Sequence, residues 1–178
     1  PQIGTKIRPV ERRGVDLVIA LDTSTSMDAE DVTPSRLAKS KLEIGKLIKN
    51  LKGDRISIIV FAGTSHLYLP LTTDYEAALL FLNQIDSEMI PTQGTILSTA
   101  MNQALESFSN DVDKFKVMLL ITDGEDHDGK AVEIASKASE TGLIINTVGV
   151  GSKSGSLIPI KDKNTQKVEY KRDRNGNL

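Results

Sequence analysis

Apolar runs alternate with amphipathic segments along most of the chain. Four of these runs are bounded by polar or turn residues, as is typical of strands buried on both faces; they cover residues 15–21, 56–61, 117–121 and 143–150. In a fifth segment, 67–71, Leu alternates with Tyr68 and Pro70, which favours an edge strand. The pattern therefore predicts five strands, four of them buried.

Between these runs, apolar residues recur at helical spacing. Leu37, Ile44 and Ile48 predict a helix that begins at Thr33-Pro34, with a hydroxyl N-cap followed by proline at the first helical position. Further helices are predicted from Asp74, from about Leu97, and over residues 131–141. Strands that alternate with helices predict an α/β fold. We expect three layers: a doubly wound, mostly parallel sheet with one antiparallel edge strand and helices on both faces.

The two ends of the chain are more polar than its centre. Residues 1–14 form a polar lead-in that contains Lys6, Arg8, Arg12 and Arg13, and residues 152–178 form a polar tail. Within the tail, 157–160 and 167–170 are predicted to pair as a small hairpin, and Asn175-Gly176 is predicted to form a turn. One domain is expected between the two ends, over residues 15–151.

Composition removes several functional classes. The 178 residues suffice for one domain, and the absence of cysteine excludes disulfides and thiolate metal sites. A net charge of −2 without a basic stripe argues against nucleic acid as a partner. No apolar run approaches the roughly 18 residues that cross a bilayer. Because the chain opens at Pro1 without Met, we expect a domain cut from a longer protein.

Three polar segments come at the ends of predicted elements. Residues 22–26 follow the first strand, 92–95 precede a helix, and 122–126 follow a later strand. In an open α/β sheet the carboxyl ends of the strands form the ligand crevice, so these segments should meet there. They offer only oxygen donors, which favour Mg²⁺, with Mn²⁺ or Ca²⁺ as alternatives, over Zn²⁺. The predicted metal ligands are Asp22, Ser24, Ser26, Thr95 and Asp123.

These five residues resemble the metal-ion-dependent adhesion site of von Willebrand factor type A domains, and the resemblance extends over residues 15–151. It implies that the two serines and the threonine contact the metal, that the aspartates act largely through water, and that an Asp or Glu of a partner protein completes the shell. Thr25 and Gln93 depart from the glycine common in that family, so we expect stiffer loops. The last helix and strand usual in the family are not found, so we expect a sheet incomplete at one edge.

Three further segments, 4–9, 26–37 and 123–127, are similar to the Bat proteins of bacterial aerotolerance operons. This resemblance implies a domain held outside the cytoplasmic membrane by transmembrane segments that lie beyond this chain. It also implies a protein partner, such as other Bat proteins or a system that contains a MoxR-type AAA+ ATPase.

An alternative is a Mg²⁺-dependent phosphohydrolase on a related α/β sheet. Such an enzyme needs an acid/base aspartate where Ser24 stands, and a hydroxyl cannot replace it at neutral pH. No Walker loop or other nucleophile motif is present, so no catalytic residues are predicted. A structural subunit that has lost its metal is a third possibility, which the complete ligand set disfavours.

The remaining polar residues have ordinary structural interpretations. Acidic residues before the first helix are expected to favour its N-terminus; they are Asp28, Glu30 and Asp31. Those after the fourth buried strand fail the EF-hand pattern and are expected to form a solvated loop; they are Glu125, Asp126 and Asp128. Neither His66 nor His127 has a Cys or His companion, so both are left out of the site.

Overall fold

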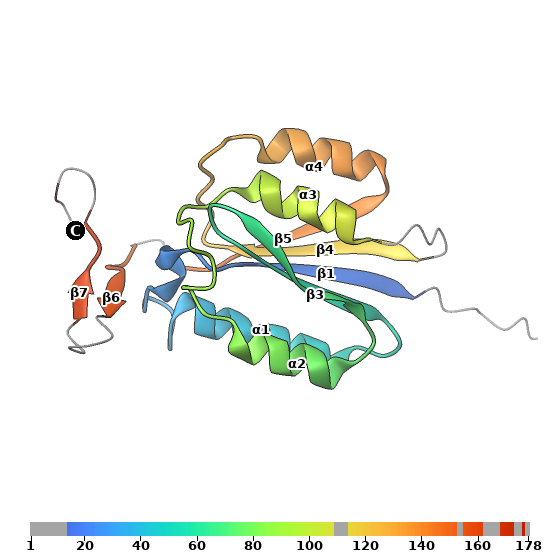
Figure 1. Ribbon diagram of the computed structural model, residues 1–178, viewed down its shortest axis with the longest axis horizontal. Helices are drawn as coiled ribbons and strands as arrows, with labels where there is room; N and C mark the ends of the chain where they lie inside the picture. The colour runs from blue at the N-terminus through green and yellow to red at the C-terminus, as the bar shows by residue number, and fades with distance from the viewer. Residues whose placement is uncertain (1–13, 109–113, 153–154, 162–167, 173–175, 177–178) are drawn as a thin grey trace, which may run out of the picture.

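The computed structural model describes residues 14–108, 114–152, 155–161, 168–172 and 176. Five strands form its main sheet in the order β3-β2-β1-β4-β5 (Figure 1). The parallel strands are β1 (Val15–Asp22), β2 (Arg55–Phe61), β4 (Phe115–Thr122) and β5 (Leu143–Gly149). The remaining strand, β3 (Ser65–Thr72), runs antiparallel to β2. The predicted fold class is confirmed.

Helices cover both faces of the sheet. On one face lie α1 (Arg36–Asn50) and α2 (Tyr75–Gln84), and on the other α3 (Leu97–Ser107) and α4 (Ala131–Glu140) (Figure 1). Successive side chains of a strand point to opposite faces. In β1, Ile19 and Leu21 therefore enter the core under α1 and α2, while Val18 and Ala20 enter the core under α3 and α4. A strand buried on both faces explains the continuous apolar run.

The predicted start of the first helix was wrong by two residues. Thr33 and Pro34 precede α1 and are joined by a cis peptide bond. Ser35 is the N-cap instead, and its hydroxyl accepts a hydrogen bond from the Ala38 N–H at 3.2 Å. The Arg36 N–H donates to the Ala29 carbonyl, so the chain between these residues is a loop closed by its own hydrogen bond. By contrast, Asp74 caps α2 as predicted.

An irregularity in β3 changes which of its leucines are buried. The pairing of β2 with β3 shifts between Ile58 and Ile59, and these residues face Leu69 and Leu67. Leu69 is buried, whereas Leu67 is exposed. Alternation alone had placed both leucines on one face, but a bulge breaks the period of two.

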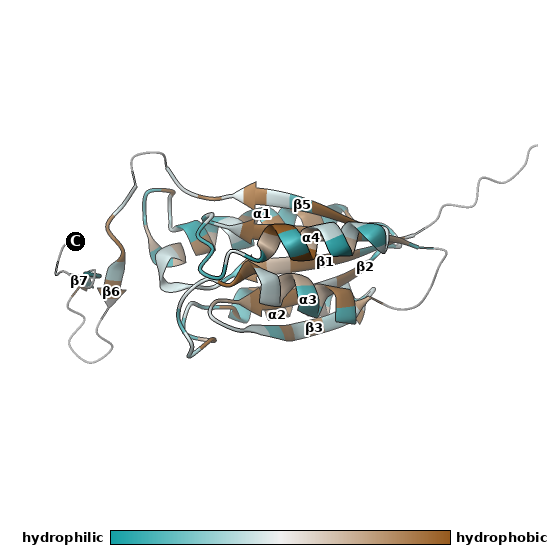
Figure 2. Cartoon of the chain, turned by 90° about the horizontal axis from the view of Figure 1, so that it is seen from above, coloured by the Kyte–Doolittle hydropathy of each residue, from teal (hydrophilic) through white to brown (hydrophobic). Residues whose placement is uncertain are grey.

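The sheet is open at β5, which has no neighbour on its outer side among the residues described. Figure 2 shows β5 at the edge of the domain. Ile144 and Val148 of this strand are 52% and 43% exposed. Between β5 and α1 lies an apolar groove of about 470 Å³, bordered by Leu47 and Leu119.

Beyond the carboxyl ends of the strands, β6 (Pro159–Lys161) and β7 (Val168–Tyr170) pair antiparallel as the predicted hairpin (Figure 1). The predicted lead-in arm and Asn175 lie outside the described residues. In the described part of the chain, no helix combines the length and the apolar character that crossing a bilayer requires.

Candidate metal centre

Three loops meet at the carboxyl edge of the sheet because β1 and β4 are parallel neighbours. Leu21 pairs with Ile121, so Asp22 and Thr122 leave their strands side by side. The Thr122 hydroxyl donates to Asp22 Oδ2 at 2.7 Å. The Ile96 N–H donates to the Ala62 carbonyl, which anchors the segment before α3 at the end of β2. All three predicted segments therefore lie at one edge.

Asp22 is fully buried at this edge, and both of its carboxylate oxygens accept hydrogen bonds. Oδ1 accepts the Ser24 N–H at 2.8 Å, and Oδ2 accepts the Thr122 hydroxyl. Burial raises the pKa of Asp22 to about 6 against the lowering effect of these hydrogen bonds, and the nearby Asp123 adds to the rise. Removal from water disfavours the charged form, so a cation at this position would favour ionisation.

The two predicted serine ligands lie together next to Asp22. A short 3₁₀ helix, η1 (Thr25–Asp28), turns the chain directly after β1. This turn brings Ser24 Oγ and Ser26 Oγ to 3.0 Å from each other, and both side chains are buried. Two hydroxyls and one carboxylate are thus gathered within five residues.

The side-chain hydroxyl of Thr95 gives the strongest indication of a metal ligand at this site. Its side chain is buried, and its Oγ1 is the one buried side-chain oxygen or nitrogen without a hydrogen-bond partner among the described residues. A buried hydroxyl without a partner is costly, and such atoms are rare in folded proteins. An oxygen left without a partner at this edge fits a metal ligand.

His127, which the sequence analysis left out, holds Thr95 in place. Its Nδ1 accepts the Thr95 N–H at 3.1 Å, and the backbone N–H of His127 donates to the Thr95 carbonyl at 2.9 Å. Gly94 faces the imidazole so closely that a Cβ there would lie 3.2 Å from Nδ1. Nothing in the sequence pairs residues 95 and 127, so no sequence signal could have found this contact.

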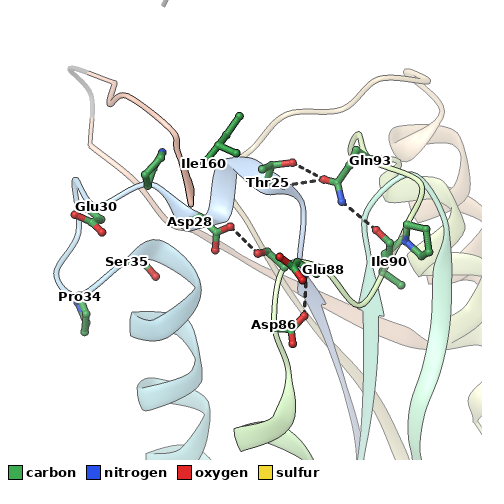
Figure 3. A pocket seen from close by; sticks show the side chains of 13 residues that line it. Thr25, Asp28, Glu30, Pro34, Ser35, Asp86, Glu88, Ile90, Gln93 and Ile160 are labelled. Carbon is green, nitrogen blue, oxygen red and sulfur yellow. Dashed lines mark hydrogen bonds between the residues drawn. The ribbon is translucent and has the colours of Figure 1, made fainter. Parts of the chain in front are cut away.

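The two departures from the family's glycines contact each other. The Thr25 N–H donates to Gln93 Oε1 at 3.1 Å, and the Thr25 hydroxyl donates to the same oxygen. Gln93 in turn donates to the Ile90 carbonyl (Figure 3). These bonds join the loop after β1 to the segment before α3. They also form one wall of a cavity of about 830 Å³, which Asp28, Asp86 and Glu88 line as well.

Several acidic residues near the site differ from expectation. Asp31 does not act on the helix N-terminus alone: it accepts two hydrogen bonds from Arg36, at 2.8 and 3.0 Å. Asp126 and Asp128 do not simply form a solvated loop, because they accept hydrogen bonds from the Leu97 N–H and the Ser98 hydroxyl at the start of α3. Helix starts carry unsatisfied N–H groups that side-chain oxygens satisfy.

The structure thus brings all five predicted ligands to one edge of the sheet. Asp123 lies beside Asp22 and accepts a hydrogen bond from Arg36 Nη1 at 3.0 Å. In the described ranges no three His, Cys, Asp or Glu side chains cluster as a metal site, so a cation here would depend on the hydroxyls. Two carboxylates and three hydroxyls suit a hard divalent cation. Their role as ligands stays a prediction.

Comparison with known proteins identifies the family. The family model for the von Willebrand factor type A domain matches residues 17–125. The chain belongs to the von Willebrand factor type A domain family. This domain is 44% identical to the conserved hypothetical protein BatB of Bacteroides thetaiotaomicron, with a TM-score of 0.86 over 92% of this chain and 78% of that one. An aerotolerance-related membrane protein of Bacteroides fragilis is similar at 43% identity, with the same TM-score over 92% of this chain and 79% of that one.

Curated relatives and remoter structures extend the comparison. A UPF0353 protein of Mycolicibacterium paratuberculosis is 26% identical over 160 residues, which are 83% of this chain and 48% of that protein. The chain thus spans about half the length of the curated relatives it matches. At 19% and 20% identity, two solved structures share the fold with TM-scores of 0.67. One is a mussel byssus matrix protein whose metal-site motif holds zinc, over 76% of this chain and 38% of that one. The other is the manganese-loaded TRAP protein of Plasmodium vivax, over 79% and 58%.

Proposed function

We propose that this domain is a metal-dependent protein-interaction module. One divalent cation, Mg²⁺ in the first place, is held by Asp22, Ser24, Ser26, Thr95 and Asp123, and an Asp or Glu of a partner protein binds to it. The observation that carries the proposal is the buried Thr95 hydroxyl, which finds no hydrogen-bond partner in the described part of the chain and lies on the edge that also holds the buried Asp22. Two solved structures of the same fold hold a divalent metal, one of them zinc at its metal-site motif and the other manganese, which supports a cation-binding domain.

The electrostatics of the edge explain why recognition would need the metal. Asp22 and Asp123 lie at the site, and four further carboxylates line the neighbouring cavity: Asp28, Glu30, Asp86 and Glu88. Without a cation, an approaching carboxylate meets like charge. Neutral hydroxyl ligands leave most of the charge on the cation, so its binding turns repulsion into attraction.

The geometry of Asp22 disfavours the phosphohydrolase alternative. A nucleophilic aspartate needs an accessible oxygen, yet Asp22 is buried and both of its oxygens accept hydrogen bonds. Ser24, at the position of the required acid/base group, bonds to Ser26 instead. We therefore propose binding without catalysis.

The relatives support a cellular setting. The Bacteroides fragilis relative is described as an aerotolerance-related membrane protein. We propose that this domain lies on the extracytoplasmic face of the cytoplasmic membrane, held there by segments beyond this chain. Its partner would be another Bat protein or part of a MoxR-type ATPase system.

The proposal is tested by affinity capture with this domain from a membrane extract of the source organism. The capture is done either with about 5 mM Mg²⁺ or with about 5 mM chelator, which is in excess over any bound ion. A specific partner should be retained with Mg²⁺, released by chelator and lost with Ser26→Ala, while circular dichroism shows the variant folded. If capture of the partner is the same with chelator and with Ser26→Ala as with Mg²⁺ and wild type, the proposal is refuted. Phosphatase turnover that disappears with Asp22→Asn would establish the enzyme instead.

A further inference from the structure

Asp123, Arg36 and Asp31 form a continuous chain of contacts at the edge of the site. Arg36, on the first turn of α1, donates to Asp123 Oδ2 through Nη1 at 3.0 Å. Its Nε and Nη2 donate to the two oxygens of Asp31 at 2.8 and 3.0 Å. One guanidinium therefore joins two carboxylates, in the two-pronged geometry that arginine provides and lysine does not.

These charges lie mostly out of water. The side chains of Arg36, Asp31 and Asp123 are only 12%, 6% and 3% exposed. The hydrogen bonds from Arg36 hold the pKa of Asp31 well below its usual range and raise the pKa of Arg36 itself. Charged groups at this depth stay stable only in a defined geometry with their partners. The position of Asp123 therefore depends on Arg36, and that of Arg36 on Asp31.

The chain that leaves β5 completes the arrangement. The Ser152 N–H donates to Asp31 Oδ2 at 2.6 Å. Gly151 lies against the guanidinium with φ of +146°, and a Cβ there would meet Arg36 Cζ and Nε at 3.1 Å. The positive φ favours glycine here, and a side chain at this position would require the guanidinium to shift. The end of β5 is thus in contact with the groups that position Asp123.

We propose that Arg36 and Asp31 are positioning residues of the metal site, which hold Asp123 for the cation and couple it to the chain that leaves β5 at Gly151 and Ser152. The inference rests on the proposed function, since it requires a cation at Asp123. It assigns a regulatory role to the end of β5: displacement of this segment lowers the affinity of the metal site, and an occupied site stabilises the segment. Such coupling between two sites is reciprocal.

Two substitutions, Asp31→Asn and Arg36→Lys, test the positioning role of Arg36 and Asp31. Each is expected to change Mn²⁺ affinity in one direction only. Among the described residues, Asp31→Asn leaves Asp123 as the one carboxylate on Arg36, which adds net positive charge and also loosens Arg36. Arg36→Lys keeps the charge and removes the fork. Both should weaken Mn²⁺ binding about tenfold, as loss of groups that orient metal ligands commonly does. Arg36→Met is unsuitable, because charge removal would favour the cation and loss of geometry would oppose it.

Matched controls exist at the other end of the sheet. Arg55 donates to both oxygens of Asp16 at 2.7 and 2.6 Å, at the start of β1 and far along the strand from Asp22. Arg55→Lys and Asp16→Asn break an equivalent fork and should leave Mn²⁺ affinity unchanged. Isothermal titration with MnCl₂ measures affinity, and melting in chelator reports stability separately. Equal affinity in wild type, Asp31→Asn and Arg36→Lys would refute the positioning role.

Coupling to β5 is tested through Gly151. Gly151→Ala should displace the guanidinium from its contacts with Asp31 and Asp123 and change Mn²⁺ affinity severalfold, although it changes no ligand. Gly155→Ala is the control, since Gly155 also has positive φ but no atom near its added Cβ. Hydrogen exchange at the Ser152 amide should slow with Mn²⁺ in wild type and not in Arg36→Lys. If wild type does not bind Mn²⁺, the proposed function is wrong. If wild type binds Mn²⁺, but Gly151→Ala leaves the affinity unchanged and Mn²⁺ does not slow exchange at Ser152, only the coupling is wrong.

Discussion

The single residue that most affects the energetics of the site is Asp22, a carboxylate buried where its own pKa opposes ionisation. Its folded-state pKa of about 6 lies above the ordinary value of 3.8, so the folded protein binds more protons than the unfolded chain between these pH values. The contribution of Asp22 to the free energy of unfolding of the metal-free protein should therefore fall as pH rises from about 4 to 6, by roughly 3 kcal/mol, and level off above.

This dependence is measured by urea unfolding in chelator between pH 4 and 7. Asp22→Asn, which stays neutral, should not show that part of the decline, so the difference between the two curves isolates Asp22. Protons and cation compete for the same carboxylate, so Mn²⁺ affinity should decrease as pH falls below about 6. Parallel unfolding curves for wild type and Asp22→Asn would contradict this account.

Removal of the Thr95 hydroxyl should have opposite effects on the stability of the metal-free protein and on its stabilisation by metal. Thr95→Val replaces a buried oxygen without a partner by a methyl group of similar size, which should stabilise the metal-free protein by about 1 kcal/mol. The same change removes a proposed ligand and should reduce stabilisation by Mn²⁺.

Thr122→Val is the matched control for that experiment. The Thr122 hydroxyl donates to Asp22 and accepts the Gly124 N–H, so its loss should destabilise the protein with and without metal. Urea unfolding in chelator and in Mn²⁺ distinguishes the two variants. Destabilisation of the metal-free protein by Thr95→Val would mean that this hydroxyl is already satisfied.

At the scale of elements, sequence periodicity predicted most of the fold. Strands buried on both faces leave long apolar runs, and Asp74 stands directly before α2 as its cap. The misses have local causes that periodicity does not contain. A bulge between Ile58 and Ile59 shifted the pairing of β3, and Ser35 rather than Thr33 met the N–H groups of α1.

The candidate site was predictable where strand ends determine it and not where loops pack on loops. Asp22 and Asp123 follow parallel strands, so their proximity follows from topology. His127 and Arg36 contact Thr95 and Asp123 across 32 and 87 residues of sequence. Side chains that reach across such distances give no periodic signal, so only the structure reveals them.

His127 provides a test of how the loops support the site. His127→Ala removes the acceptor of the Thr95 N–H and should lower Mn²⁺ affinity about tenfold, although the residue is not a proposed ligand. His66→Ala is the control, because His66 lies exposed on β3. Titration calorimetry measures both. Equal effects of the two variants would show that the contact with Thr95 has no bearing on the metal.

At the scale of the whole molecule, buried polar side chains gather at one edge of an otherwise apolar sheet. Asp22, Ser24, Ser26 and Thr95 are all buried there, and removal of their polar groups from water costs free energy. A cation would offset this cost, so folding and metal binding should be linked. The five strands and four helices then provide a rigid support on which loops at one edge set specificity.

That linkage predicts a metal-dependent melting temperature. At ten times its dissociation constant, Mg²⁺ or Mn²⁺ should stabilise the fold by RT ln 11, roughly 1.4 kcal/mol, which corresponds to about 3–6 °C for a domain of this size. Asp22→Ala should abolish the shift, whereas Glu133→Gln, which removes a carboxylate on the exposed side of α4, should preserve it. Differential scanning calorimetry over a series of metal concentrations measures the effect. An unchanged shift in Asp22→Ala would place the cation away from the end of β1, with Asp126 and Asp128 as the next carboxylates to substitute.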